Sequence, residues 1–227
     1  MNAAFFRICF ICLFCVLTGM RVYYKLRAGF LRERIYAREE NPGFIVFRSV
    51  VGVPLLWAVF AYAFVPGSFG WMYVTLPSWL RLTGVVLGGA AIALLFWVHQ
   101  TLGVNFSTSL APRHVHAMIN RGPYAWVRHP MYSAYFSLFL AAFLISQSWL
   151  AGATGLAIIL MLMTLRRIRE EGLLIERFGE EYRSYRAATG MFLPRFATVL
   201  GRDPRVMRGR AEEPARRFQT PAGSDAP

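Results

Sequence analysis

Residues 131–165 read MYSAYFSLFLAAFLISQSWLAGATGLAIILMLMTL, an apolar stretch without a charged side chain. A bilayer core about 30 Å thick needs ~20 helical residues, so this stretch is too long for one span and short for two full ones. Ser146, Gln147 and Ser148 interrupt it near its middle. We therefore predict a hairpin of two short helices joined by a tight polar turn.

Three more apolar runs precede the hairpin, and each has the length of one membrane span: Ala3 to Tyr24, Val46 to Val65, and Leu80 to Trp97. The composition, 56% hydrophobic and 16% charged, departs from that of soluble domains in the same direction. We predict an all-α, polytopic integral membrane protein with about five transmembrane helices, including a short C-terminal hairpin.

Basic side chains predict the orientation, because cytoplasmic loops collect Lys and Arg. The segment Pro66 to Trp79 carries no charge, whereas the connections between the first two spans, before the hairpin and after it are basic. Their basic residues are Lys25, Arg27, Arg32, Arg34, Arg38, Arg113, Arg121, Arg128, Arg166, Arg167 and Arg169. The N-terminus is therefore expected outside and the C-terminus in the cytoplasm. Lys25 is the single lysine, which is typical of a GC-rich, bacterial genome and indicates a bacterial inner membrane.

The net charge of +13 indicates contact with membrane lipids, since the basic residues do not form a stripe interleaved with exposed aromatics. No nucleic-acid partner is expected. Cys9, Cys12 and Cys15 are the only cysteines, and no fourth accompanies them. They are expected to be small apolar residues of a helix, so we predict no metal site.

Three regions are predicted along the chain. Residues 1–100 form N-terminal transmembrane helices, residues 101–200 a catalytic membrane region, and residues 201–227 a disordered basic tail with few large apolar residues. Within the second region, 166–188 is expected to form a cytoplasmic amphipathic helix. Its apolar positions are Ile168, Leu174, Ile175, Phe178, Tyr182 and Tyr185.

Two polar motifs flank the hairpin on the same predicted side. Before it, the stretch from Arg121 to Tyr132 ends in His129-Pro130, which suits the start of a helix. An interfacial anchor with an aromatic belt is the alternative interpretation. After it, Arg166 and Glu170 share one helix face, either as a functional pair or as a weak surface ion pair.

These motifs resemble the isoprenylcysteine carboxyl methyltransferase family, within a broader group of membrane phospholipid methyltransferases. The resemblance rests on the Arg-His-Pro-Met-Tyr run ending at Tyr132 and on the Glu-Glu pair with the Phe-Gly and two tyrosines after it, and it covers roughly Thr108 to Pro194. It implies S-adenosyl-L-methionine as cofactor, with Arg166 and Glu170 catalytic and Arg166 facing the substrate. The implied cofactor-binding residues are His116, Ala117, Met118, Ile119, Tyr124, His129, Pro130, Met131, Tyr132 and Glu170.

The chain departs from the family at two places. Ala134 stands where glycine is usual, and Ala187 to Gly190 replaces a common Arg-Val-Pro run. The resemblance implies carboxyl O-methylation of an isoprenylcysteine-like or other lipophilic acid, on a small-molecule or lipid-anchored substrate. The alternatives are a phosphatidylethanolamine-type N-methyltransferase, for which Glu170, Glu171 or His129 would act as base, and an NADPH-dependent membrane sterol-type reductase. Two further alternatives are not enzymes: a small transporter or channel, and a catalytically inactive adaptor.

Overall fold

The computed structural model describes residues 2–27, 42–65, 67–102 and 118–195. Within them the structure is helical, and β-pairing is confined to two isolated bridges. The main helices are α1 (Ala3–Arg27), α3 (Pro42–Phe64), α4 (Ser78–Leu102), α5 (Pro130–Ser146), α6 (Trp149–Met161) and α7 (Arg167–Ala188). Shorter turns are η2 (Gly70–Met72), η4 (Gly122–Ala125) and the π-helical η5 (Leu162–Arg166). The predicted all-α class is confirmed for the described residues.

Three of the described helices are long and apolar enough to cross a membrane: Ala3–Tyr24, Ser78–Leu102 and Trp149–Ala188. Ser49–Phe64 and Pro130–Ser146 are shorter apolar helices. The last candidate runs on through η5 into α7 over 40 residues, twice the ~20 that a bilayer core needs. Its charged side chains begin at Arg166, so its apolar part ends at Leu165 and α7 extends beyond it.

The predicted hairpin is confirmed as α5 and α6. Gln147 adopts a left-handed conformation at the end of α5, and its N–H donates to the Phe143 carbonyl over 2.7 Å. The Ser148 hydroxyl then caps α6 by accepting from Ala151 N at 3.3 Å. These polar residues satisfy backbone groups that a helix end would otherwise leave unpaired.

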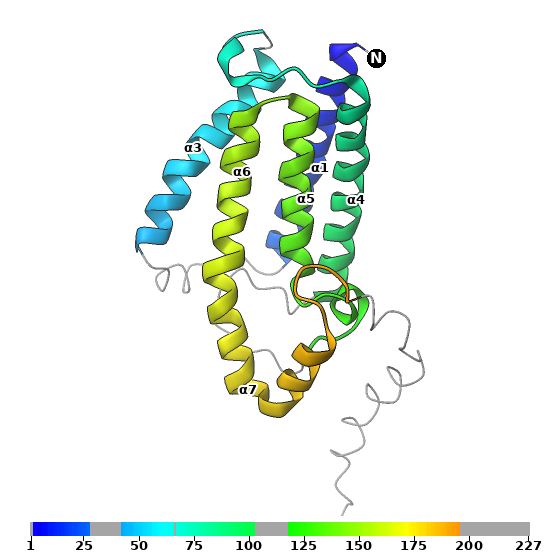
Figure 1. Cartoon of the computed structure of the whole chain (residues 1–227), viewed down its shortest axis with the longest axis vertical. Helices are drawn as coiled ribbons and strands as arrows, with labels where there is room; N and C mark the ends of the chain where they lie inside the picture. The colour runs from blue at the N-terminus through cyan, green and yellow to red at the C-terminus, as the bar shows by residue number, and fades with distance from the viewer. Residues whose placement is uncertain (1, 28–41, 66, 103–117, 196–227) are drawn as a thin grey trace, which may run out of the picture.

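Helix α5 lies at the centre of the bundle, between the α1 and α4 pair and α6 (Figure 1). One buried cluster joins α1, α4 and α5: Leu13, Leu17, Ala91, Leu95, Ala134 and Leu138. A second joins α1, α3 and α5: Phe6, Phe10, Tyr62, Ala142 and Ile145. Small residues such as Ala134 and Ala142 are fully buried in α5, as close helix packing in membranes requires.

Arg81 of α4 stabilises the end of α5 that is far from the polar motifs. Its Nε and Nη2 donate to the Ile145 carbonyl over 3.1 and 2.9 Å, and Nη2 donates to the Tyr62 hydroxyl over 3.1 Å. Its guanidinium also lies 3.9 Å from the centre of the Phe6 ring. A buried arginine therefore has a structural role at the hairpin turn.

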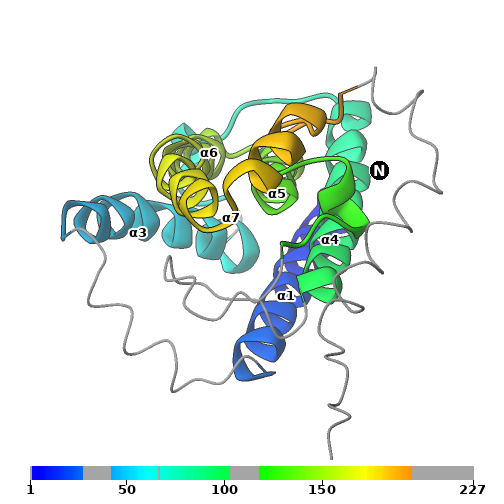
Figure 2. The ribbon, with the colours of Figure 1, turned by 90° about the horizontal axis from the view of Figure 1, so that it is seen from below.

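The helix predicted over 166–188 corresponds to α7, but its apolar positions do not form a buried stripe. Tyr182 is buried, whereas Ile168 is exposed. Gly179 interrupts the helix with φ 52° and ψ −124°, a conformation that costs little only for glycine. The chain turns back at this point, and the remainder of α7 approaches the foot of α5 (Figures 1 and 2).

Candidate active site

The His-Pro-x-Tyr run forms the start of α5. His129 is the residue before the helix, and Pro130 occupies the first turn, where its missing N–H costs no hydrogen bond. The His129 carbonyl accepts from Tyr132 N at 3.1 Å and from Ser133 N at 3.3 Å. The His129 and Tyr132 rings stack with centroids 5.5 Å apart, so both point toward the same side of α5.

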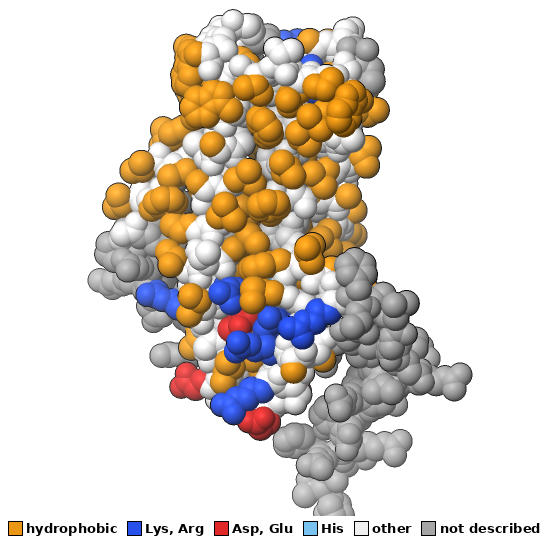
Figure 3. Space-filling model, in the orientation of Figure 1, with side chains coloured by type: hydrophobic (Ala, Val, Ile, Leu, Met, Phe, Trp, Pro, Cys, Tyr) orange, Lys and Arg blue, Asp and Glu red, His pale blue; other side chains and the backbone are white. Residues whose placement is uncertain are grey.

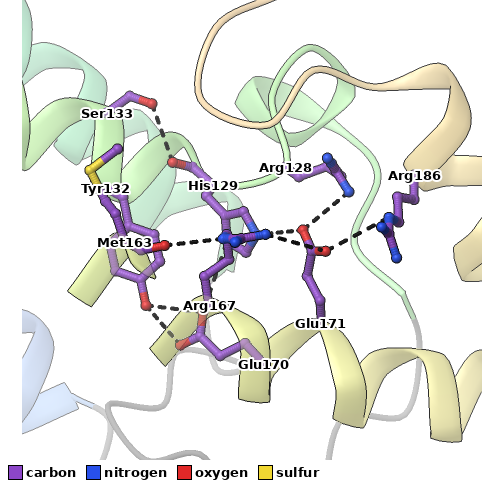
Figure 4. Close-up of polar contacts among 9 residues, drawn as sticks. All are labelled: Arg128, His129, Tyr132, Ser133, Met163, Arg167, Glu170, Glu171 and Arg186. Carbon is purple, nitrogen blue, oxygen red and sulfur yellow. Dashed lines mark hydrogen bonds and ion pairs between the residues drawn. The ribbon is translucent and has the colours of Figure 1, made fainter. Parts of the chain in front are cut away.

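The two glutamates of α7 reach these two rings (Figure 4). The Tyr132 hydroxyl lies 3.0 Å from both carboxylate oxygens of Glu170. His129 Nε2 lies 3.1 Å from Glu171 Oε1, and its Nδ1 lies 3.9 Å from Glu170 Oε2. Glu170 and Glu171, which are adjacent on α7, therefore contact Tyr132 and His129, which are about one helical turn apart at the start of α5.

The π-helical turn η5 precedes the glutamates. A π turn adds a residue to a helical turn and is frequent at functional sites, because it rotates the helix that follows. Arg167 Nε donates to the Met163 carbonyl over 3.1 Å across this turn. The turn thus sets the direction in which Glu170 and Glu171 leave α7.

Glu171 is surrounded by arginines. Arg128 Nη1 lies 3.1 Å from its Oε1, and Arg186 Nε and Arg167 Nη1 lie 3.8 and 3.9 Å from its Oε2. The hydrogen bond from His129 and the charge of Arg128 lower the pKa of Glu171, although burial acts against them. Its carboxylate is therefore ionised at neutral pH, and both of its oxygens are engaged.

The segment after α7, Thr189 to Phe192, lies along the His-Pro motif, and we call it the return segment. Arg128 N and His129 N donate to the carbonyls of Gly190 and Met191 over 2.8 and 3.0 Å. The Ser133 hydroxyl donates to the Phe192 carbonyl over 2.6 Å. Backbone hydrogen bonds therefore hold His129 against a segment that comes much later in the sequence.

Tyr124 connects the η4 turn to the same region. Its carbonyl accepts from the Tyr185 hydroxyl at 2.7 Å. Burial raises the pKa of its own hydroxyl, and the nearby Tyr185 and the negative charge of Glu170 raise it further. The Tyr124 hydroxyl therefore lies close enough to Glu170 and Tyr185, both on α7, to be affected by their charges.

The structure brings together His129, Tyr132 and Glu170 of the predicted site and places Tyr124 within their influence. Pro130 and Met131 form the first turn of α5. Met118 and Ile119 are half-buried ahead of η4. His116, Ala117 and the Arg166 side chain lie outside the described residues, as does the predicted tail.

The sequence did not predict the ionic cluster around Glu171. Glu171 was a member of the Glu-Glu pair and one of several candidate bases, and Arg128 was a basic loop residue at the start of the His-Pro motif. Arg167 and Glu171 are four residues apart, as are Arg166 and Glu170, so an ion pair between Arg167 and Glu171 could have been predicted from the sequence. The contact of Arg186 with Glu171 could not, because it depends on the turn at Gly179. In the described part of the chain, no three His, Cys, Asp or Glu side chains form a metal-binding group.

Comparisons with known proteins point to the same region of the chain. Residues 79–176 match the isoprenylcysteine carboxyl methyltransferase (ICMT) family. The protein-S-isoprenylcysteine O-methyltransferases of Homo sapiens and Mus musculus are each 27% identical over 126 residues. Those residues are 55% of this chain and 44% of each relative, so the chain spans less than half the length of these curated relatives.

A solved structure of the eukaryotic intramembrane Ras methyltransferase ICMT is also similar, with 20% identity and a TM-score of 0.49. The likeness covers 82% of this chain and 67% of that one. The matched residues 79–176 include both His129 and the Glu170-Glu171 pair. The resemblance of this chain to the isoprenylcysteine carboxyl methyltransferase family is therefore confirmed over residues 79–176.

Proposed function

We propose that this protein is an S-adenosyl-L-methionine-dependent methyltransferase that acts on a lipophilic substrate at the membrane surface. The observation that carries the proposal is the pairing of Tyr132 with Glu170 and of His129 with Glu171, at the end of the apolar helix bundle where α5 begins. The family match over the same residues supports it. The relatives' names, which give an isoprenylcysteine O-methyltransferase, supply the substrate class.

The residues at this site fit the proposed cofactor. Glu170 is the more open of the two glutamates, with 28% of its side chain exposed against 7% for Glu171. Its carboxylate suits an ammonium or hydroxyl group, and the surplus of arginines over carboxylates suits an acidic group. When bound, S-adenosyl-L-methionine supplies a methyl group activated by a sulfonium.

The protein's own contribution is to hold two reactants in attack geometry and to exclude water. We assign cofactor binding to the set predicted from the sequence and the orientation of an acidic acceptor to Arg166. A carboxylate acceptor is already ionised at neutral pH, so its methylation needs no general base. Catalysis by positioning is consistent with a site in which Glu171 is fully engaged by His129 and Arg128.

We further propose that about five helices cross the bilayer, with α3 and the α5–α6 hairpin completing the three long candidates. Residues 1–100 would then anchor a catalytic region over 101–200, followed by the basic tail at 201–227. With the basic loops facing the cytoplasm, the C-terminus and both motifs would lie on the cytoplasmic side of a bacterial inner membrane. Membrane lipids surround the exposed apolar side chains, and a lipophilic substrate enters between helices.

Ligand-dependent thermal stability of the detergent-purified protein tests the function. A ligand at 100 times its Kd stabilises the folded state by about 2.7 kcal/mol, so S-adenosylhomocysteine is expected to raise the Tm by several degrees. NADPH is the control. Stabilisation by NADPH and none by S-adenosylhomocysteine would contradict the proposal and favour the reductase alternative.

The acceptor is tested with Arg166→Ala and Arg166→Lys. If Arg166 holds an acid, its removal is expected to lower methylation about a hundredfold at every pH, because a charged hydrogen bond contributes roughly 2–3 kcal/mol. Lysine should restore only part, since it lacks the planar guanidinium. Near-full activity of Arg166→Ala, with a rate that rises with pH on phosphatidylethanolamine, would favour the N-methyltransferase alternative.

A further inference from the structure

The adjacent glutamates of α7 differ in their surroundings. Glu171 is buried and contacts His129, Arg128 and Arg186, whereas Glu170 is more open and accepts a hydrogen bond from Tyr132. The two carboxylates therefore have different tasks, although they are chemically identical. Figure 4 shows Glu171 between His129 and the arginines, and Glu170 on the Tyr132 side.

The contact with Glu171 determines where the His129 ring carries its proton. The guanidinium groups of Arg128, Arg167 and Arg186 lie 3.1, 3.9 and 3.8 Å from the Glu171 carboxylate, and their positive charge favours its ionised form, so its oxygens can only accept. His129 Nε2, 3.1 Å from Glu171 Oε1, must therefore be the N–H donor. In the neutral ring, Nδ1 is then a hydrogen-bond acceptor.

Nδ1 lies next to a second acceptor. It is 3.9 Å from Glu170 Oε2, too far for a hydrogen bond between them. The 3.9 Å separation is less than twice the usual ~2.8 Å, so one donor nitrogen or oxygen can bridge the two acceptors. Such a donor would come from a ligand with an ammonium or hydroxyl group.

We propose that Glu171 is a positioning residue: its carboxylate holds His129 as the Nε2–H tautomer, so that Nδ1 and Glu170 together accept an N–H or O–H donor of S-adenosyl-L-methionine. This proposal rests on the proposed function. The arginines explain why the carboxylate itself stays in place. Arg128, Arg167 and Arg186 approach it, and the buried Tyr182 hydroxyl faces Glu171 and Arg128.

The tautomer can be observed directly by NMR of protein labelled with ¹⁵N-histidine, without cofactor. The chain has four histidines, and comparison with His129→Gln identifies the signals of His129. Recorded where the ring is neutral, the spectrum should show a protonated Nε2 and an unprotonated Nδ1. An Nδ1–H tautomer would overturn the proposal.

Glu171→Gln provides a second readout. His129 Nε2 and Arg128 Nη1 contact the same oxygen, Oε1, so the carboxamide should keep its oxygen there. A neutral amide oxygen accepts more weakly than a carboxylate, so the share of the Nε2–H tautomer should fall. Affinity for S-adenosylhomocysteine should then fall roughly tenfold to a hundredfold, as when carboxylates that orient histidines are removed at metal sites. Glu176→Gln, an exposed change on the same helix, should leave both the tautomer and the affinity unchanged.

A double-mutant cycle separates positioning from direct contact. If Glu171 acts through His129, Glu171→Gln should cost little affinity once His129 is alanine. Additive losses would show that Glu171 touches the cofactor itself and would overturn the proposal. If the wild type binds no S-adenosylhomocysteine, the proposed function fails, whereas the NMR measurement still decides the tautomer.

Discussion

At the scale of single residues, the site depends on hydroxyl and imidazole groups that meet carboxylates at the end of an apolar bundle. Tyr132 donates to Glu170, and His129 donates to Glu171. A hydrogen bond to a charged partner contributes more than a neutral one, roughly 1.5–3 kcal/mol. Single-atom substitutions at these positions are therefore expected to have measurable effects.

Tyr132→Phe removes the hydroxyl that lies 3.0 Å from both oxygens of Glu170. We expect affinity for S-adenosylhomocysteine to fall about tenfold in calorimetric titration, since Glu170 loses the donor that fixes its direction. Tyr73→Phe is the matched control, because the buried Tyr73 hydroxyl has no hydrogen-bond partner among the residues that the structure describes. Equal losses in both variants would remove Tyr132 from the site.

Acid should destabilise the protein through Glu171. Its pKa in the folded state is lowered, first by the His129 hydrogen bond, from an ordinary value near 4.5. The contribution of ionised Glu171 to the free energy of unfolding is therefore fully present above about pH 4.5. It is lost as the pH falls through the lower folded-state pKa. Between pH 6 and 3, the Tm of the wild type should fall more steeply than that of Glu171→Gln.

Glu171→Gln should also be less stable at pH 7, by roughly 3 kcal/mol, because it removes one partner of a buried ionic cluster. Glu176→Gln controls for the loss of a surface carboxylate, since Glu176 is exposed. A Glu171→Gln curve parallel to that of the wild type would show that another carboxylate controls the acid transition.

At the scale of elements, three segments hold the site: the start of α5, the first half of α7, and the return segment. The return segment contributes backbone carbonyls, so its sequence matters chiefly where a side chain would not fit. Gly190 is such a position, because a Cβ there would collide with the Leu193 carbonyl oxygen. The departure from an Arg-Val-Pro run thus coincides with a close backbone approach.

Gly190→Ala is expected to displace the return segment and to weaken the hydrogen bond from Arg128 N to the Gly190 carbonyl. The Tm should fall, at a cost of roughly 1–3 kcal/mol, and binding of S-adenosylhomocysteine should weaken with it. Gly172→Ala is the control on α7, where an added Cβ meets nothing within 4 Å. It should be neutral or slightly stabilising, since alanine favours helix. Unchanged binding in Gly190→Ala would separate the return segment from the site.

At the scale of the whole molecule, apolar and charged surfaces are separated along the bundle axis. Figure 3 shows apolar side chains over most of one face and charged ones gathered at its lower end, around α7. The N-terminus and the turn between α5 and α6 lie at the opposite end (Figure 1). The short turn η2 lies beside the start of α6, because Trp149 Nε1 donates to the Trp71 carbonyl over 2.9 Å. This arrangement would let the proposed apolar substrate and the proposed water-soluble cofactor reach the same site from the membrane and from water.

Topology mapping checks this arrangement in cells. A reporter fused after Gly201 should be active in the cytoplasm, and one inserted near Gly70 should be active outside, because basic loops are expected to face the cytoplasm. A fusion to the turn at Gln147 should behave like the one at Gly70, since the Gln147 carbonyl accepts from Val74 N at 2.9 Å and Trp149 Nε1 donates to the Trp71 carbonyl over 2.9 Å. A reversed result would separate the motifs from the cytoplasmic cofactor.

The sequence by itself determined the helical membrane class, the hairpin with its polar turn, and the two motifs of the family. These features are local: apolar length, a Pro-started helix and i,i+4 spacing are properties of neighbouring residues. The tertiary structure decided which glutamate meets which ring, since His129 and Glu171 are 42 positions apart. It also decided the approach of Arg186 and of the return segment, because both depend on the rotation at η5 and the turn at Gly179.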